Sequence, residues 1–194
     1  MSGFQLARNY AQTEYPAPLE TFIITGDGSN PALAIGDVVQ IEPAVPSATG
    51  IMACKRAVLT ANGQTMLGIV MGNSIDPDNE IVGIPLNFSG TREILVNTNT
   101  QAVYEVEVDF GTAEVVIADI GNTIALVPGT SVVGSISTSG MKVDGNAKAS
   151  GANSQDHPFL ILAISEFQSG STVNALKVLV TPNATLFNAG QEGA

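Results

Sequence analysis

The 194-residue sequence contains no tryptophan, one cysteine, one histidine and few basic residues. A single cysteine, Cys54, excludes an intrachain disulfide. A single histidine, His157, excludes a zinc site, which needs several imidazole or thiolate ligands. Lysine and arginine number 7 against 18 aspartates and glutamates, so the net charge is −11. Such a chain cannot build the basic surface that follows nucleic-acid phosphates, and nucleic-acid binding is not expected.

Long apolar segments are also missing. No window approaches about 18 uninterrupted apolar residues, so we expect no membrane-spanning helix. The first residues lack the basic and apolar regions of a signal peptide, which favours a protein made and assembled in a cytoplasm. Because hydrophobic residues make up 44% of the chain and charged residues only 13%, the composition indicates a folded protein rather than a disordered one.

Short apolar runs separated by Gly, Pro, Asn, Asp and Ser dominate the chain. Turn signals recur about every 8–12 residues, as in an all-β sandwich or barrel, and no segment shows a sustained helical period with caps. We therefore predict an all-β fold, an antiparallel β-sandwich or barrel of jelly-roll-like type. An extended N-terminal arm is expected over residues 1–18. The β domain should cover 19–187, either whole or as subdomains 19–97 and 98–187, with a loose tail over 188–194.

The clearest alternation of apolar and acidic residues lies in residues 103–110. Tyr104, Val106, Val108 and Phe110 share one face of the expected strand, and the other face carries the carboxylates Glu105, Glu107 and Asp109. This row lies within a stretch, 93–141, that contains no lysine or arginine. Three interpretations remain open: a solvated outer face, a docking surface for a basic partner, or a cation site.

Candidates for catalysis and metal binding are few. Cys54 precedes Lys55 and Arg56, which could activate a thiol, but a small buried residue in a strand is the simpler interpretation. The acidic loop 76–80 lacks the spacing of a calcium loop. His157 beside Asp156 lacks a nucleophile motif. We expect no catalytic residues, no metal and no cofactor, and therefore not an enzyme.

The first residues are unusually rich in aromatic and apolar side chains for a terminus. Pro16 and Pro18 favour an extended backbone there. An arm that lies across another subunit would have this composition, and so would a frayed terminus. The residues with which such an arm would make contact are Phe4, Leu6, Tyr10 and Tyr15.

Several segments together resemble tailed-bacteriophage head proteins. The main one is 102–126, AVYEVEVDFGTAEVVIADIGNTIAL, in which a V-Y-E-V strand precedes acidic residues and an I-G-N step. The remaining similar segments are 138–144, 158–164, 175–187 and the Gly-Asp-Val-Val step at 36–39. One departure is that such proteins often end the last strand near a histidine, whereas Asn183 is followed here by Ala184.

The resemblance implies a capsid decoration, or cement, protein on the outer surface of a phage head. Its expected partners are the major capsid protein and further copies of itself, as a homotrimer. The first contacts to test would be the arm residues and the Glu105, Glu107 and Asp109 face. Two alternatives stay open: a host-recognition or carbohydrate-binding β module, and a β-barrel hydrolase.

Overall fold

The computed structural model describes residues 3–9, 19–27, 32–42, 51–57, 66–73, 83–85, 87–133, 138–149 and 157–183. Within these residues the regular structure is almost entirely β, and the all-β prediction is confirmed. No helix among them is long and apolar enough to cross a membrane. The elements are β1 (Gln5–Asn9), β2 (Leu19–Asp27), β3 (Val38–Ile41), β4 (Ala53–Arg56), β5 (Gly68–Asn73), β6 (Ser89–Asn97), β7 (Ala102–Asp109), the 3₁₀ turn η1 (Ile117–Asp119), β8 (Thr123–Val127), β9 (Lys142–Ala149), β10 (Phe159–Phe167) and β11 (Ala175–Pro182).

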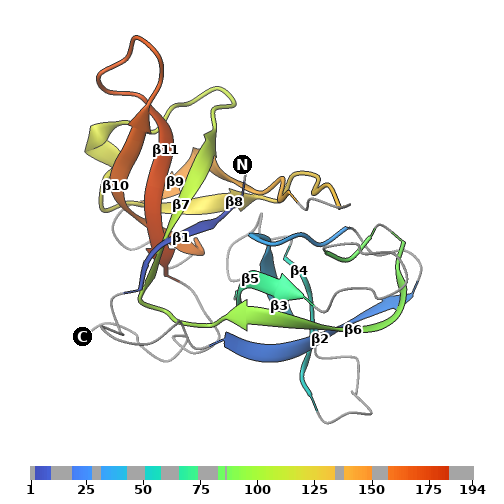
Figure 1. Cartoon of the computed structure of the whole chain (residues 1–194). Helices are drawn as coiled ribbons and strands as arrows, with labels where there is room; N and C mark the ends of the chain where they lie inside the picture. The colour runs from blue at the N-terminus through green and yellow to red at the C-terminus, as the bar shows by residue number, and fades with distance from the viewer. Residues whose placement is uncertain are drawn as a thin grey trace.

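Strands β2 to β6 close into a small barrel, here called barrel 1, in the order β2-β4-β3-β5-β6. The pairing of β2 with β4 is parallel, and the other pairings are antiparallel. β2 and β6 form the longest ladder, from Leu19 opposite Asn97 to Asp27 opposite Ser89. Figure 1 shows this barrel as a unit separate from the later strands.

Strands β7 to β11 form a second ring, barrel 2, in the order β7-β11-β10-β8-β9. A parallel pairing of Val108 with Val143 and of Asp109 with Asp144 joins β9 back to β7 and closes the ring. The first half of β7 carries an additional antiparallel strand, β1. The domain therefore consists of two small barrels with one parallel pairing each, rather than a single sandwich.

The two barrels have the same connectivity. If the strands of each are numbered in chain order, both rings read first, third, second, fourth, fifth, and only the first and third strands are parallel. The irregularities match as well. Val70 pairs with Val96 just before a bulge in barrel 1, and Ile161 pairs with Val180 just before a bulge in barrel 2. Barrel 2 thus repeats the architecture of barrel 1.

The turn before the second strand is built alike in both barrels. Gly36 has a φ of 89° and Gly121 a φ of 92°, a region that residues with a Cβ atom rarely adopt. The amide of Gly36 donates to the carbonyl of Val70 at 2.8 Å, and that of Gly121 to Ile161 at 2.9 Å. Each acceptor residue in turn donates its own amide to the residue after the glycine, at 2.9 Å in both barrels. We call these segments the strand-2 turns.

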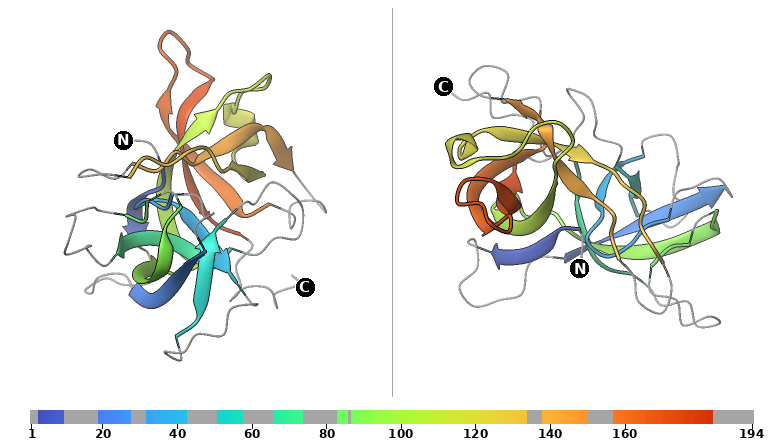
Figure 2. Two further views of the ribbon diagram at one scale, coloured as in Figure 1. Left: turned by 90° about the vertical axis from the view of Figure 1, so that its right-hand side faces the viewer. Right: turned by 90° about the horizontal axis from the view of Figure 1, so that it is seen from above.

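The barrels are joined through their cores. One apolar cluster fills barrel 1 alone. The larger cluster fills barrel 2 and also includes Val38, Ala57, Met66 and Ile69 of barrel 1. The segment after β8 reaches over barrel 1 (Figures 1 and 2). The units lie within residues 19–97 and 98–187, but they share buried apolar surface, which stabilises their relative placement.

Candidate interaction surfaces

Phe4 is buried inside the chain. Its ring stacks on Phe159 with 4.6 Å between centroids and meets the Tyr104 ring edge-on at 6.3 Å, two geometries that aromatic pairs prefer. Its amide donates to the carbonyl of Gly36 at 3.2 Å. This corrects the expectation of an extended arm for residues 3–9, because Phe4 fills the space where the barrels meet.

The residues after Phe4 form β1 along β7, with Gln5 opposite Glu105 and Leu6 opposite Tyr104. The strand has five residues and a bulge, so its alternation is too short to recognise in the sequence. The side chain of Leu6 is partly exposed. Tyr10 and Tyr15, the other expected arm contacts, lie outside the described residues.

The alternation predicted for β7 is present, with Tyr104, Val106 and Val108 buried. On its outer face Glu107 lies 3.4 Å from the ammonium of Lys142, and Glu105 lies 3.8 Å from that of Lys177. The carboxylate row is therefore partly neutralised by lysines from β9 and β11, strands that are distant from β7 in the sequence.

Lys177 also binds Glu166, at 2.8 Å. The hydrogen bond that Lys177 donates to Glu166, together with the surrounding carboxylates, raises the pKa of Lys177 above its ordinary value. Asp109 lies half-buried at the end of the row, beside Asp144 of β9. Among the described residues no group of three or more acidic, histidine or cysteine side chains could hold a metal ion.

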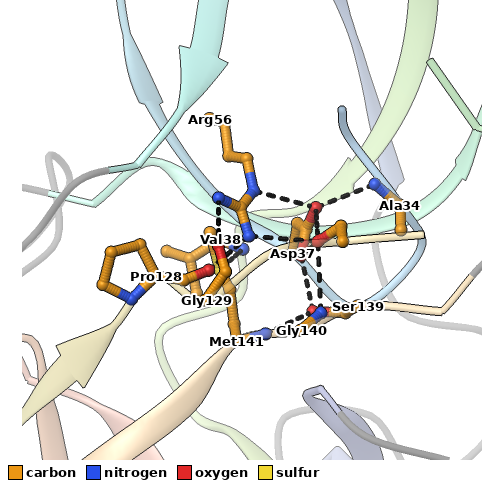
Figure 3. A network of polar contacts seen from close by, with 10 residues as sticks. Ala34, Asp37, Val38, Arg56, Pro128, Gly129, Ser139, Gly140 and Met141 are labelled. Atoms are coloured by element: carbon orange, nitrogen blue, oxygen red, sulfur yellow. Dashed lines mark hydrogen bonds and ion pairs between the residues drawn. The ribbon is translucent and has the colours of Figure 1, made fainter. Parts of the chain in front are cut away.

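The most connected polar site is buried between the barrels, at the strand-2 turn of barrel 1 (Figure 3). The carboxylate of Asp37 is fully buried. It accepts hydrogen bonds from the amide of Ala34 at 2.8 Å, from the hydroxyls of Ser131 and Ser139, and from Arg56 Nε at 3.2 Å. Four donors compensate the cost of burying this charge.

Arg56 extends the same network into barrel 2. Its guanidinium donates to the carbonyls of Pro128 and Gly129 and to the hydroxyl of Ser131. The ion pair of barrel 1 therefore binds the backbone that connects β8 to β9. We call this group of residues the clamp: Asp37, Arg56, Pro128, Gly129, Ser131 and Ser139.

The clamp is not apparent in the sequence. In the sequence Asp37 stands out only within the Gly-Asp-Val-Val step, and Arg56 only as a neighbour of Cys54. The signal in the sequence is a charged residue beside each of two strands: Asp37 directly precedes β3, and Arg56 is the last residue of β4. A buried aspartate and a buried arginine each need a partner of opposite charge. Their sequence separation of 19 residues concealed the pair.

Barrel 2 has a related ion pair at its own strand-2 turn. Lys148 binds Asp119 at 2.6 Å, and Asp119 also accepts the amide of Val116 at 2.9 Å. Partial burial opposes ionisation of Asp119, but these hydrogen bonds and the Lys148 charge outweigh it and lower its pKa. Arg56 and Lys148 occupy equivalent positions in the two sheets. Arg56 lies opposite Val39 and Lys148 opposite Ile124 in the strand pairing, and each of these partners is three residues after the glycine of its turn.

The other residues considered for chemistry are placed as follows. Cys54 is buried in barrel 1, where burial and the Glu42 charge raise its pKa to about 12. Its thiol therefore stays protonated, and its buried place in β4 agrees with the simpler interpretation, a small buried residue in a strand. His157 is half-buried, and its carbonyl accepts a hydrogen bond from Asn183 at 3.0 Å. The acidic loop 76–80 and Asp156 lie outside the described residues.

Comparison with protein-family models, with curated proteins and with solved structures gave no match. The function of the chain is therefore inferred from its own residues.

Proposed function

We propose that the chain is a structural protein of a tailed phage that decorates and cements the assembled capsid. It binds on the outer surface of the head, across junctions between subunits of the major capsid protein, and it associates with copies of itself as a homotrimer. It catalyses no reaction and needs no cofactor.

The clamp is the observation that carries this proposal. Among the described residues, Asp37 and Arg56 form the only ion pair buried between the barrels. All of its hydrogen bonds go to groups of this chain, and they hold the two barrels together. A catalytic charge usually faces a cleft that substrate can enter, whereas Asp37 and Arg56 bind backbone and hydroxyl groups of the same chain. Such a rigid double barrel is a suitable scaffold for protein–protein contacts.

The charge of the chain also supports an outer position. At −11 the protein would be repelled by the phosphates of a DNA-filled interior, whereas the outer surface imposes no such cost. Glu105, Glu107 and Glu166 exceed the lysines that pair with them, so the outer face of β7 and β11 stays acidic. It complements a basic surface on the shell.

The mechanism is mechanical. A protein that binds the expanded shell more tightly than free subunits stabilises the expanded state by mass action. Contacts repeated around the shell add avidity, because each further contact forms at a high effective concentration.

The test is co-sedimentation of the purified chain with shells of its cognate capsid protein, before and after expansion. We expect saturable binding to expanded shells and weaker binding at higher salt. The double variant Glu105→Lys/Glu107→Lys should bind less, while Glu20→Lys/Glu42→Lys, with the same change of charge on barrel 1, should bind like wild type. Failure of the wild type to bind either shell would contradict the proposal. Deletion of residues 2–18 is a poor test because it removes Phe4 and β1 from the fold.

A further inference from the structure

Both strand-2 turns have an isoleucine at the same corner. In each turn the fourth residue donates its amide to the carbonyl of the first, at 3.1 Å in 34–37 and at 3.0 Å in 119–122. The second residue is an isoleucine, and the third is a glycine with a positive φ. Ile120 has a φ of −61° and a ψ of 126°, which with the φ of 92° at Gly121 is the geometry of a type II turn. Ile35 and Ile120 therefore occupy equivalent positions in the two barrels.

The two isoleucine side chains are exposed to a similar degree, 38% for Ile35 and 44% for Ile120. In barrel 1 Phe4 covers Gly36 and the clamp covers Asp37, yet the isoleucine before them stays exposed. Proline is common at this corner of a type II turn, and only the position after it requires glycine. The turn itself therefore does not require an isoleucine in either barrel.

The isoleucine and the glycine are the only residues that the two turns share. The turn sequences are Ala-Ile-Gly-Asp at 34–37 and Asp-Ile-Gly-Asn at 119–122. The positive φ angle explains the glycine. A single exposed apolar side chain is ordinary on a protein surface, but the same one occurs here at the same corner of two barrels, and the turn does not require it. The repetition indicates a contact that both barrels make.

We propose that Ile35 and Ile120 are equivalent anchors, which bind the same apolar pocket on two neighbouring subunits of the capsid shell. The inference rests on the proposed function and names contacts that bridge a subunit junction. Because the two positions are equivalent, the spacing and rotation that relate the barrels also relate the anchors. Their partner must therefore present one pocket twice, and a shell of identical subunits does so.

Two anchors on one chain give avidity. When the first anchor is bound, the second binds at a high effective concentration, and joint binding exceeds either single affinity by about 10²–10⁴. The clamp fixes one barrel on the other, so binding of the second anchor does not have to order a flexible linker. The anchor contacts are apolar and should persist in high salt, whereas salt screens the contacts of Glu105 and Glu107.

The test is co-sedimentation of the full chain with expanded shells of its cognate capsid protein at high salt. The variants are Ile35→Asp, Ile120→Asp and the two together. The controls are Leu19→Asp on barrel 1 and Phe167→Asp on barrel 2, which add the same charge at side chains that are 43% and 40% exposed. We expect the two single variants to bind similarly, about 10²-fold or more below wild type. The double variant should not bind, and the controls should bind like wild type.

Further substitutions separate the loss of the apolar contact from a change in charge or folding. Ile35→Ser and Ile120→Ser remove the aliphatic side chain without adding charge, and they should weaken binding as the aspartate variants do. Ile35→Val and Ile120→Val keep an aliphatic side chain and should bind close to wild type. Circular dichroism melting curves check that every variant is folded.

The outcomes distinguish this inference from the proposed function. If wild type binds and the isoleucine variants bind like the controls, the inference is overturned and the proposed function stands. A loss at only one isoleucine also overturns it, because the two barrels would then not bind alike. Light scattering coupled to size-exclusion chromatography tests the same variants without shells, and loss of self-association there would overturn it in favour of a contact with a second copy. A wild type that binds no shell contradicts both proposals.

Discussion

The two barrels differ most at a position that their common architecture makes equivalent. In barrel 1 the ion pair beside the strand-2 turn joins side chains that are 7% and 0% exposed, those of Arg56 and Asp37. In barrel 2 the basic residue at the equivalent position, Lys148, pairs with Asp119, and the two side chains are 18% and 15% exposed. One turn has become an internal interface and the other faces outward. The strand-2 turn of barrel 1, with the clamp and Phe4, therefore forms the contact between the barrels, here called the joint. The same local structure in barrel 2 faces outward.

The largest expected effect comes from breaking the two ion pairs separately. Asp37→Ala leaves the Arg56 charge buried without its partner and should cost about 3–5 kcal/mol of unfolding free energy. Asp119→Ala removes a partly solvated pair and should cost at most about 1 kcal/mol. Urea unfolding of both variants, with wild type as reference, measures the difference. Equal losses of unfolding free energy would contradict the conclusion that only the barrel 1 turn is a buried interface.

Removal of Phe4 should have the next largest effect. Phe4→Ala loses the stack on Phe159 and the edge contact with Tyr104, a core truncation that costs about 3 kcal/mol. Phe167→Ala removes a ring of the same size that is partly exposed in barrel 2, and its loss should be under about 1 kcal/mol. If thermal melting shows both variants equally stable, Phe4 is not part of the joint.

The two turn glycines offer a matched comparison of smaller size. Alanine at either position must adopt the positive φ angle of the glycine, which lowers the free energy of unfolding by about 1–2 kcal/mol. At Gly36 the new Cβ atom would also lie 2.9 Å from the Phe4 carbonyl oxygen, which adds about 1–3 kcal/mol. Gly36→Ala should therefore unfold at lower urea than Gly121→Ala. The reverse order would show that Phe4 does not cover the turn in solution.

The smallest effect is the pH dependence of the Asp119–Lys148 ion pair in barrel 2. Because the folded-state pKa of Asp119 lies below its ordinary value of 3.8, its ion pair contributes fully above that pH. The contribution is lost as pH falls through the lower, folded-state pKa. The stability advantage of wild type over Asp119→Asn, under about 1 kcal/mol, should therefore shrink on acidification below about pH 4. An advantage that persists in strong acid would contradict this assignment.

The sequence predicts those features of the fold that depend on neighbouring residues. The alternation in 103–110 correctly identifies β7 and its buried face, because a strand places successive side chains on opposite sides. The parallel pairings of β2 with β4 and of β7 with β9 were not predictable, since each joins strands separated by other strands. The repeat was also hidden, because the equivalent turns share only an Ile-Gly step, at 35–36 and 120–121.

For the candidate surfaces, too, the sequence predicts only what neighbouring residues determine. Glu105 and Glu107 were identified from their spacing, but the lysines that pair with them lie on β9 and β11. From the sequence Phe4 is expected in an arm, because an aromatic residue near a terminus does not reveal which cavity it fills. Long-range packing decides such cases, and local pattern carries no information about it.

The most direct test of the account is amide hydrogen exchange at Gly36 and Gly121, measured by NMR at a concentration where the chain is monomeric. The two amides make matched hydrogen bonds, of 2.8 and 2.9 Å, and differ in what covers them. The account predicts slow exchange at Gly36, limited by opening of the joint, and faster exchange at Gly121. Equal protection of the two amides would contradict the claim that one turn is a closed interface and the other an open one.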